Sequence, residues 1–171
     1  MGDSRVSART WVLLGVALVV VMLAVFGLAG KSTPTSRVAR ALPSERLAGA
    51  DVTLASLRGH PALVTFWASW CEPCKEEAPA LERFSRGLHG NGVLVGVNWG
   101  DTSVSAARAF IKRYGWSFPN LRDPEQTVGH ELGVRVLPTT FLIDGEGRVR
   151  ETLRGPQSEQ SLQRALASVG G

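Results

Sequence analysis

Two cysteines, Cys71 and Cys74, are the whole cysteine content of this chain of 171 residues, and two residues separate them. A short apolar run precedes the pair and a helical pattern follows it, which places Cys71 at the start of a helix. Unpaired N–H groups and the positive end of the helix dipole favour a thiolate at this position. A thiolate attacks disulfides, and Cys74, one helical turn further on, can then resolve the mixed disulfide. The spacing therefore predicts thiol–disulfide exchange.

Two other uses of a close cysteine pair, a zinc site and a structural disulfide, are less well supported by the sequence. A zinc site needs two more ligands, and the three histidines His60, His89 and His130 are dispersed beside turn residues. A purely structural disulfide across two intervening residues closes a very small loop and adds little stability. No metal site is predicted, and redox exchange is favoured over both alternatives.

The elements that must position the cysteines follow from the pattern of apolar residues. A buried strand over Ala62–Trp67 leads to the cysteine pair, and a helix is expected from about Cys71 to about Arg86. Further strands are expected at residues 51–57, 93–98, 120–122, 139–143 and 148–153, and further helices at residues 102–114, 124–132 and 158–169. Strand–helix–strand connections and a closing hairpin predict an α/β domain, with a central mixed β-sheet flanked by helices.

The residues 11–29 form a run of 19 residues without a charged or strongly polar side chain. As a helix this run would be roughly 28 Å long, close to the hydrocarbon thickness of a bilayer. We expect a single N-terminal transmembrane signal anchor at 11–29, after a cytoplasmic stub at 1–10 and before a linker at 30–45 and a domain at 46–171. A cleaved signal ending at Gly27-Leu28-Ala29 and a buried core helix are the alternatives.

Charge excludes one class of partner and leaves the orientation of the anchor open. The chain carries 19 Lys and Arg against 15 Asp and Glu, a net charge of +4. The basic residues are scattered without a stripe, so no nucleic-acid partner is expected. Arg5 and Arg9 precede the apolar run, whereas Lys31, Arg37 and Arg40 follow it, which mildly opposes a cytoplasmic N-terminus. The predicted redox chemistry favours a domain outside the cytoplasm.

The residues around the cysteines resemble a known superfamily. Residues 66–77 read Phe-Trp-Ala-Ser-Trp-Cys-Glu-Pro-Cys-Lys-Glu-Glu, and further matching stretches lie at 95–98, 114–115, 118–119 and 136–143. In this order, over about residues 47–167, they are similar to the thioredoxin-like superfamily and, within it, to the membrane-anchored TlpA, ResA and CcmG-type thiol–disulfide oxidoreductases. The resemblance implies a thioredoxin-like fold and no bound cofactor.

The resemblance also implies a role for each matching position. Cys71 corresponds to an exposed nucleophile and Cys74 to the resolving cysteine. Pro138 corresponds to a cis-proline that faces the disulfide and lets Leu137 offer its backbone to an extended partner peptide. Thr65 stands where general thioredoxins carry a buried aspartate, and a threonine cannot act as a base near neutral pH.

Glu77 is the residue that can take the place of this missing base. It follows Cys74 by three residues, so Cys71, Cys74 and Glu77 approach one face of the predicted helix. The ResA-type proteins that the chain resembles carry a functional glutamate here. We hypothesise that Glu77 exchanges a proton with the thiol of Cys74 and that its charge raises the pKa of the thiols.

Other residues are expected on the surface that contacts the substrate. Besides Leu137 and Pro138, these candidates are Trp70, Glu72, Pro73 and Asp101. Asp101 matches an acidic position near the active site of the family, and a helix cap is an equal alternative for it. Glu72 and Glu76 also fit solvated charges on a helix face. Trp67 is expected in the core, and Trp70 on an exposed rim.

The expected function is that of a disulfide reductase tethered to the outer side of the plasma membrane. The resemblance implies a protein disulfide as substrate and a membrane dithiol carrier as electron donor. The expected client is apocytochrome c, whose cysteines must be reduced before haem attachment, and a general reductase of other envelope proteins is the alternative.

Three further function classes are less favoured alternatives. A thiol peroxidase needs a peroxide-binding threonine before the cysteine and a supporting arginine, and neither pattern is present. A Cu(I) metallochaperone would bind the metal through Cys71, Cys74 and a histidine such as His130. An inert anchored binding module would have unreactive thiols.

Overall fold

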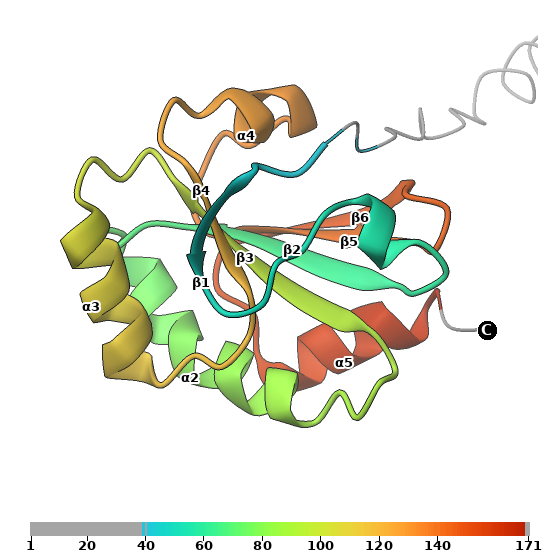
Figure 1. Cartoon of the computed structure of the whole chain (residues 1–171). Coiled ribbons are helices and arrows are strands. Elements are labelled where there is room, and N and C mark those ends of the chain that lie inside the picture. Colours follow the sequence, from blue (N-terminus) through green and yellow to red (C-terminus); the bar gives the residue numbers. More distant parts are fainter. Residues whose placement is uncertain (1–38, 40, 170–171) are drawn as a thin grey trace, which may run out of the picture. The chain divides into compact units, whose positions relative to one another are not determined.

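The computed structural model describes residue 39 and residues 41–169 (Figure 1). The predicted stub and anchor at 1–29, and residues 30–38 and 40 of the predicted linker, lie outside the described residues. Within the part that is described, no helix is long and apolar enough to cross a bilayer. In chain order the elements are β1 (Glu45–Ala48), η1 (Ala55–Leu57), β2 (Ala62–Trp67), α2 (Glu72–Arg86), β3 (Val93–Trp99), α3 (Val104–Tyr114), β4 (Asn120–Asp123), α4 (Thr127–Leu132), β5 (Thr139–Ile143), β6 (Val149–Arg154) and α5 (Glu159–Ala167).

The strands form one mixed sheet in the order β1-β4-β3-β2-β5-β6. The central strand β2 is buried along its whole length, parallel to β3 and antiparallel to β5. Phe66, near the end of β2, lies opposite Val97 of β3 and Thr139 of β5. The carboxyl ends of β2 and β3 therefore meet the start of β5 at one edge of the sheet, and the cysteines follow directly from that edge. The predicted α/β architecture with a mixed sheet is confirmed.

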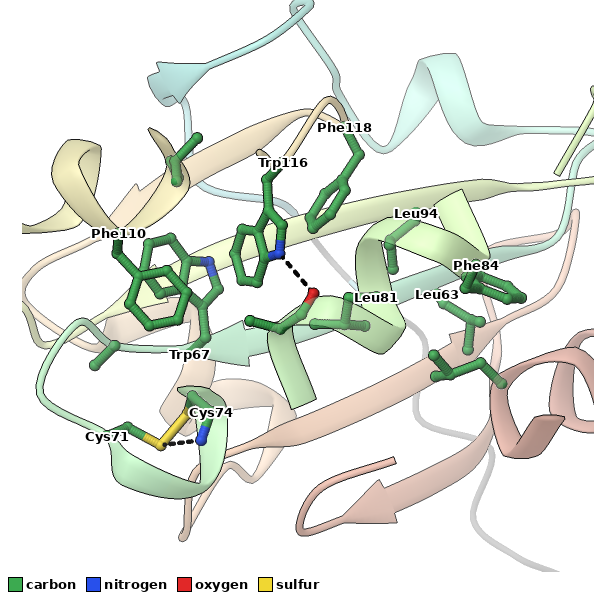
Figure 2. Close-up of a cluster of buried hydrophobic side chains, with 14 of the residues drawn as sticks. Leu63, Trp67, Cys71, Cys74, Leu81, Phe84, Leu94, Phe110, Trp116 and Phe118 are labelled. Carbon is green, nitrogen blue, oxygen red and sulfur yellow. Dashed lines mark hydrogen bonds between the residues drawn. A yellow bond between two sulfur atoms is a disulfide. The ribbon is translucent and has the colours of Figure 1, made fainter. Parts of the chain in front are cut away.

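Helices cover both faces of the sheet, as predicted (Figure 1). Side chains alternate along β2, so Leu63 and Trp67 pack with α2, α3 and α5, whereas Val64 and Phe66 pack with η1 and α4 on the other face. Two apolar clusters result, one on each side. The first cluster includes both cysteines and is drawn in Figure 2.

The helix that carries the cysteines is held against this cluster by two side-chain contacts. The indole N–H of Trp116 donates to the carbonyl oxygen of Ala78 at 3.0 Å (Figure 2). The carboxylate of Glu82 accepts from the N–H of Ser117 at 2.9 Å and from its hydroxyl at 3.0 Å. Both partners belong to the connection between α3 and β4, so α2 has a defined position relative to the sheet.

Residues 51–57 are not the predicted strand. Thr53 and Ser56 each accept the backbone N–H of the other through their hydroxyl oxygens, at 3.2 and 3.0 Å. These local bonds compete with strand pairing and lead into the short helix η1. The first strand is instead β1, which begins at Glu45, the last residue of the predicted linker, and pairs antiparallel with β4.

Helix α4 begins later than predicted. The expected range starts at Pro124, whereas α4 begins at Thr127. The carboxylate of Asp123 accepts the backbone N–H groups of Val128 and Gly129 at 3.3 and 2.8 Å, so it satisfies the free donors of a helix that starts after the turn.

Candidate active site

The two cysteines form a disulfide at the carboxyl end of β2 (Figure 2). Cys71 is the N-cap residue of α2, and the backbone N–H of Cys74 donates to its Sγ atom at 3.2 Å. Pro73 lies within the first turn, where the missing N–H of proline costs no helical hydrogen bond. When the disulfide is reduced, a negatively charged Cys71 sulfur would keep this donor and the favourable end of the helix dipole. The predicted position of Cys71 at a helix start is confirmed.

The disulfide is more buried than the sequence suggested. Cys71 is exposed over 4% of its surface and Cys74 over 1%. The expected exposed nucleophile is therefore largely covered, because both cysteines belong to the apolar cluster beneath α2, against which Leu137 packs. Cys71 is the slightly less buried of the two.

Glu77 is a carboxyl group in the apolar interior. It lies one turn after Cys74 on the buried face of α2 and is only 2% exposed. Burial raises the pKa of Glu77 from 4.5 to about 8, and a hydrogen bond from the backbone N–H of Gln157 at 3.3 Å opposes this effect. A carboxyl group with this pKa can gain and lose a proton near neutral pH, which suits acid–base work on a neighbouring thiol.

Thr65 occupies the interior of β2 without a charged neighbour in the sheet. It is fully buried and lies opposite Gly96 of β3 and Thr140 of β5. The position at which general thioredoxins have an acid is thus a neutral one here, and the overlying helix α2 contributes Glu77 as a buried acid one turn after Cys74.

The Leu137–Pro138 peptide bond is cis, as the resemblance implied. Pro138 directly precedes β5 and is buried, and Leu137 is half-buried. Among the described residues, neither the N–H nor the C=O of Leu137 has a backbone hydrogen-bond partner. Both groups are therefore free to pair with an extended peptide, in the manner of an added strand.

Two exposed apolar side chains, together called the apolar rim, are close in the chain to Cys71 and to Pro138. Trp70, directly before Cys71, is 62% exposed, and Val136, two residues before Pro138, is 50% exposed. The predicted exposure of Trp70 and burial of Trp67 are both confirmed. Val136 was not predicted as a site residue, although its position beside the Leu137–Pro138 bond was the available signal.

Glu72 and Pro73 are exposed at the start of α2. Glu72 forms an ion pair at 2.7 Å with Lys75, which lies three residues later on the same helix. The neighbouring Glu76 is exposed as well, in agreement with its interpretation as a solvated helix-face charge. Glu72 and Pro73 are thus accessible to a bound substrate, whereas Glu77 is not.

Asp101 is buried and is not the cap of α3, which was one of its two predicted roles. It is 3% exposed, and the N-cap of α3 is Ser103, whose hydroxyl accepts from Ala106 N–H. The carboxylate of Asp101 instead accepts the backbone N–H of Ser69 at 2.7 Å and the side-chain amide of Asn98 at 3.1 Å. Because Ser69 lies two residues before Cys71, Asp101 orders the turn that leads to the nucleophile.

The structure does not gather a metal site around the cysteines. Within the described ranges no three His, Cys, Asp or Glu residues are arranged to hold an ion. His130 belongs to α4, which covers the face of the sheet opposite α2, and its ring packs edge-on against Trp99 with the ring centres 5.4 Å apart.

Comparison with known proteins agrees with this geometry. Residues 25–167 match the Redoxin family. The thiol:disulfide interchange protein HelX of Rhodobacter capsulatus is 38% identical over 140 residues, which cover 78% of this chain and 77% of HelX. The thiol–disulfide oxidoreductase ResA of Bacillus subtilis is 36% identical over 115 residues, which cover 67% of this chain and 64% of ResA.

Solved structures show the same arrangement of elements. StoA from Bacillus subtilis superposes with a TM-score of 0.67 at 27% identity, over 75% of this chain and 97% of StoA. A DsbF homologue from Corynebacterium diphtheriae superposes with a TM-score of 0.64 at 25% identity, over 81% of this chain and 96% of the homologue. The chain therefore belongs to the Redoxin family and is one of its thiol–disulfide oxidoreductases.

Proposed function

We propose that this chain is an extracytoplasmic disulfide reductase in which Cys71 attacks, Cys74 resolves and Glu77 carries the proton. The observation that carries the proposal is the position of Glu77, a buried acid one helical turn beyond Cys74 whose pKa burial raises to about 8. No other element of the fold is needed to bring this acid to the resolving thiol, because both residues belong to α2.

The exchange proceeds in two balanced steps. The thiolate of Cys71 attacks one sulfur of the client disulfide, which forms a Cys71–client disulfide and releases the other client sulfur as a thiolate that takes up a proton. Glu77 then accepts the proton of the Cys74 thiol, and the Cys74 thiolate attacks the Cys71 sulfur. This step forms the Cys71–Cys74 disulfide and releases the second client thiolate, so the client gains two electrons and the protein loses them.

Burial of the resolving pair supports a reducing direction. A disulfide exchange protein becomes a strong oxidant when its reduced form is stabilised. Here a Cys74 thiolate would be almost wholly buried, and an ionised Glu77 on the same helix face would repel it. Both effects disfavour the reduced, ionised form relative to the disulfide, so the dithiol tends to pass its electrons to a client.

The anchor, the donor and the client belong to the same proposal. The apolar run at 11–29 would hold the domain on the outer side of the plasma membrane, and a membrane dithiol carrier would reduce the disulfide again. The cysteine pair of apocytochrome c is the proposed client, on the strength of the resemblance to CcmG-type proteins. The rim of Trp70 and Val136 supports a polypeptide client, since apolar side chains around a reactive group favour an extended protein segment.

A trapping experiment with the full chain tests the client and the location together. Cys74→Ala leaves Cys71 able to attack and removes the resolving thiol, so a client should accumulate as a mixed disulfide in membranes. The double variant with Cys71→Ala is the matched control and should trap nothing. Recovery of apocytochrome c supports the specific client, other envelope proteins indicate a general reductase, and recovery of cytoplasmic proteins alone contradicts the proposed location.

A further inference from the structure

The loop between β6 and α5 contacts two parts of the proposed active site. Gly155 donates its backbone N–H to the carbonyl oxygen of Pro138 at 2.9 Å. Two residues later, Gln157 donates its backbone N–H to Oε1 of Glu77 at 3.3 Å. One short loop thus joins the segment that would receive a client to the acid that would carry the proton.

The side chain of Gln157 holds the loop in this shape. Its Nε2 atom donates to the carbonyl oxygens of Gly155 at 2.9 Å and Arg154 at 3.4 Å. Its Oε1 atom accepts from the hydroxyl of Ser161 on α5 at 2.8 Å. Pro156 lies between the two donating residues, and its restricted φ limits the freedom of the loop.

We propose that residues 155–157 are a positioning element that couples client docking at Pro138 to the proton transfer at Glu77. The inference rests on the proposed function, in which Glu77 takes the proton of Cys74. A peptide paired with Leu137 orders this segment and the loop bonded to it. The ordered N–H of Gln157 then stabilises the ionised form of Glu77, so the base is more available when a client is bound. By linkage, ionised Glu77 favours client binding to the same degree.

No charged side chain of the described residues competes for this role. None of them forms an ion pair or hydrogen bond with Glu77, and the pKa of Glu77 is raised by burial and lowered by the N–H of Gln157. The charged side chains beside the loop face solvent or pair elsewhere: Arg154 is exposed and Glu159 pairs with Arg83. The other titratable groups at buried positions of this helix and its cap are the two cysteines once the disulfide is reduced, and Glu82, whose carboxylate binds Ser117 and pairs with Arg86.

The test measures the resolving step with two adducts on the full chain in detergent. Cys71 is joined at pH 4 either to an eight-residue extended peptide through its single cysteine or to N-acetylcysteine amide, which has no flanking residues. After a jump to pH values between 5 and 10, mass spectrometry follows the release of each thiol. In the natural sequence, the midpoint of the pH–rate profile for the peptide should lie about one unit below that for the small adduct, the size of one hydrogen bond to a charged group.

Gln157→Ala removes the bonds that hold the loop and should abolish this difference. Gln157→Asn has a shorter side chain, so it should weaken the bond to Gly155 and reduce the difference between the two midpoints. It replaces Gln157→Ala in the experiment if the alanine variant does not fold. Gln160→Ala, an exposed residue of α5, should keep the full difference. Equal midpoints for both adducts in the natural sequence, or a difference that survives Gln157→Ala, would overturn the coupling. A Glu77→Gln variant with unchanged profiles would instead overturn the proposed function itself, so the two failures are distinguishable.

Discussion

Asp101 accepts the backbone N–H of Ser69 at 2.7 Å, and this bond ties the loop after β3 to the turn before Cys71. The oxygen that accepts this bond also accepts the side-chain amide of Asn98. The acid is buried, so it acts on the nucleophile through the backbone and without contact with solvent. A residue of this kind affects both stability and the placement of the active-site turn.

Replacement of Asp101 should therefore loosen the turn. Asp101→Ala leaves the N–H of Ser69 without its acceptor and should lower the free energy of unfolding by about 2 kcal/mol. It should also raise KM for a peptide disulfide more than it lowers kcat, because the turn positions Trp70. Asp101→Asn keeps an oxygen acceptor and should lower the free energy of unfolding by about half as much. Urea denaturation of the oxidised protein and steady-state kinetics measure both effects.

The control for these variants is Asp51→Ala, which removes an exposed aspartate whose ion pair with Arg46 lies on the surface. It should change the free energy of unfolding by less than about 0.5 kcal/mol. Equal losses in the free energy of unfolding from Asp51→Ala and Asp101→Ala would show that the bond to Ser69 stabilises the fold no more than an exposed ion pair does.

Glu77→Gln should slow the resolving step by about 100-fold at pH 7, the usual size of a general-base contribution. In the natural sequence the rate should rise with pH until Glu77 is ionised, near its pKa of about 8. The glutamine variant should lose this dependence and follow the ionisation of the thiol alone. Stopped-flow measurement of product release after rapid mixing with a peptide disulfide gives the profile.

Glu76→Gln is the matched control, since it removes an exposed charge one position away on the same helix. Its pH–rate profile should coincide with that of the natural sequence. If the two glutamine variants behave alike, the effect of Glu77 is one of general charge and the proton-transfer role is wrong.

The same acid predicts how stability depends on pH. Burial raises the pKa of Glu77 to about 8 in the folded oxidised protein, whereas the ordinary value of 4.5 applies to the unfolded chain. Between these two values the folded protein holds a proton that the unfolded chain has lost. The free energy of unfolding therefore falls as pH rises, by up to about 1.4 kcal/mol per unit from this group. The contribution of Glu77 to the free energy of unfolding is fully present below pH 4.5 and is lost as the pH rises through about 8.

Urea denaturation of the oxidised protein between pH 4 and 9 measures this slope without interference from thiols. The difference in free energy of unfolding between Glu77→Gln and the natural sequence should change steadily over the window and level off at both ends. Parallel curves for the two proteins would mean that folding does not raise the pKa of Glu77.

Trp70→Ala should weaken client binding without harming the fold. Because its indole is largely exposed, its loss should change the free energy of unfolding by less than about 0.5 kcal/mol. If the indole is buried by a bound polypeptide, kcat/KM for a peptide disulfide should fall by about 10-fold or more. Val136→Ala should act in the same direction with a smaller effect. Oxidised glutathione is the comparison substrate, and equal losses for it and the peptide would argue against a polypeptide-binding rim.

Much of the fold follows from local chemistry that a sequence displays directly. The helix predicted at 102–114 is α3 (Val104–Tyr114), which Ser103 caps and which ends at Gly115 in the left-handed conformation. The closing helix likewise begins after Ser158. The strand predicted at 51–57 failed because the hydroxyls of Thr53 and Ser56 bind the backbone locally, while the true edge strand β1 depends on pairing with distant β4.

The amino-acid sequence by itself determined the chemistry of this protein: two cysteines one turn apart at a helix start, with an acid on the same helix face. These relationships lie within one helix, whose geometry the chain order dictates. Only the tertiary structure decided how buried these groups are, and therefore that the pKa of Glu77 is raised. It also decided that Asp101 supports the turn before Cys71 and that Gln157 reaches Glu77. Such contacts join residues far apart in the chain, and they form only when the sheet brings its loops to one edge.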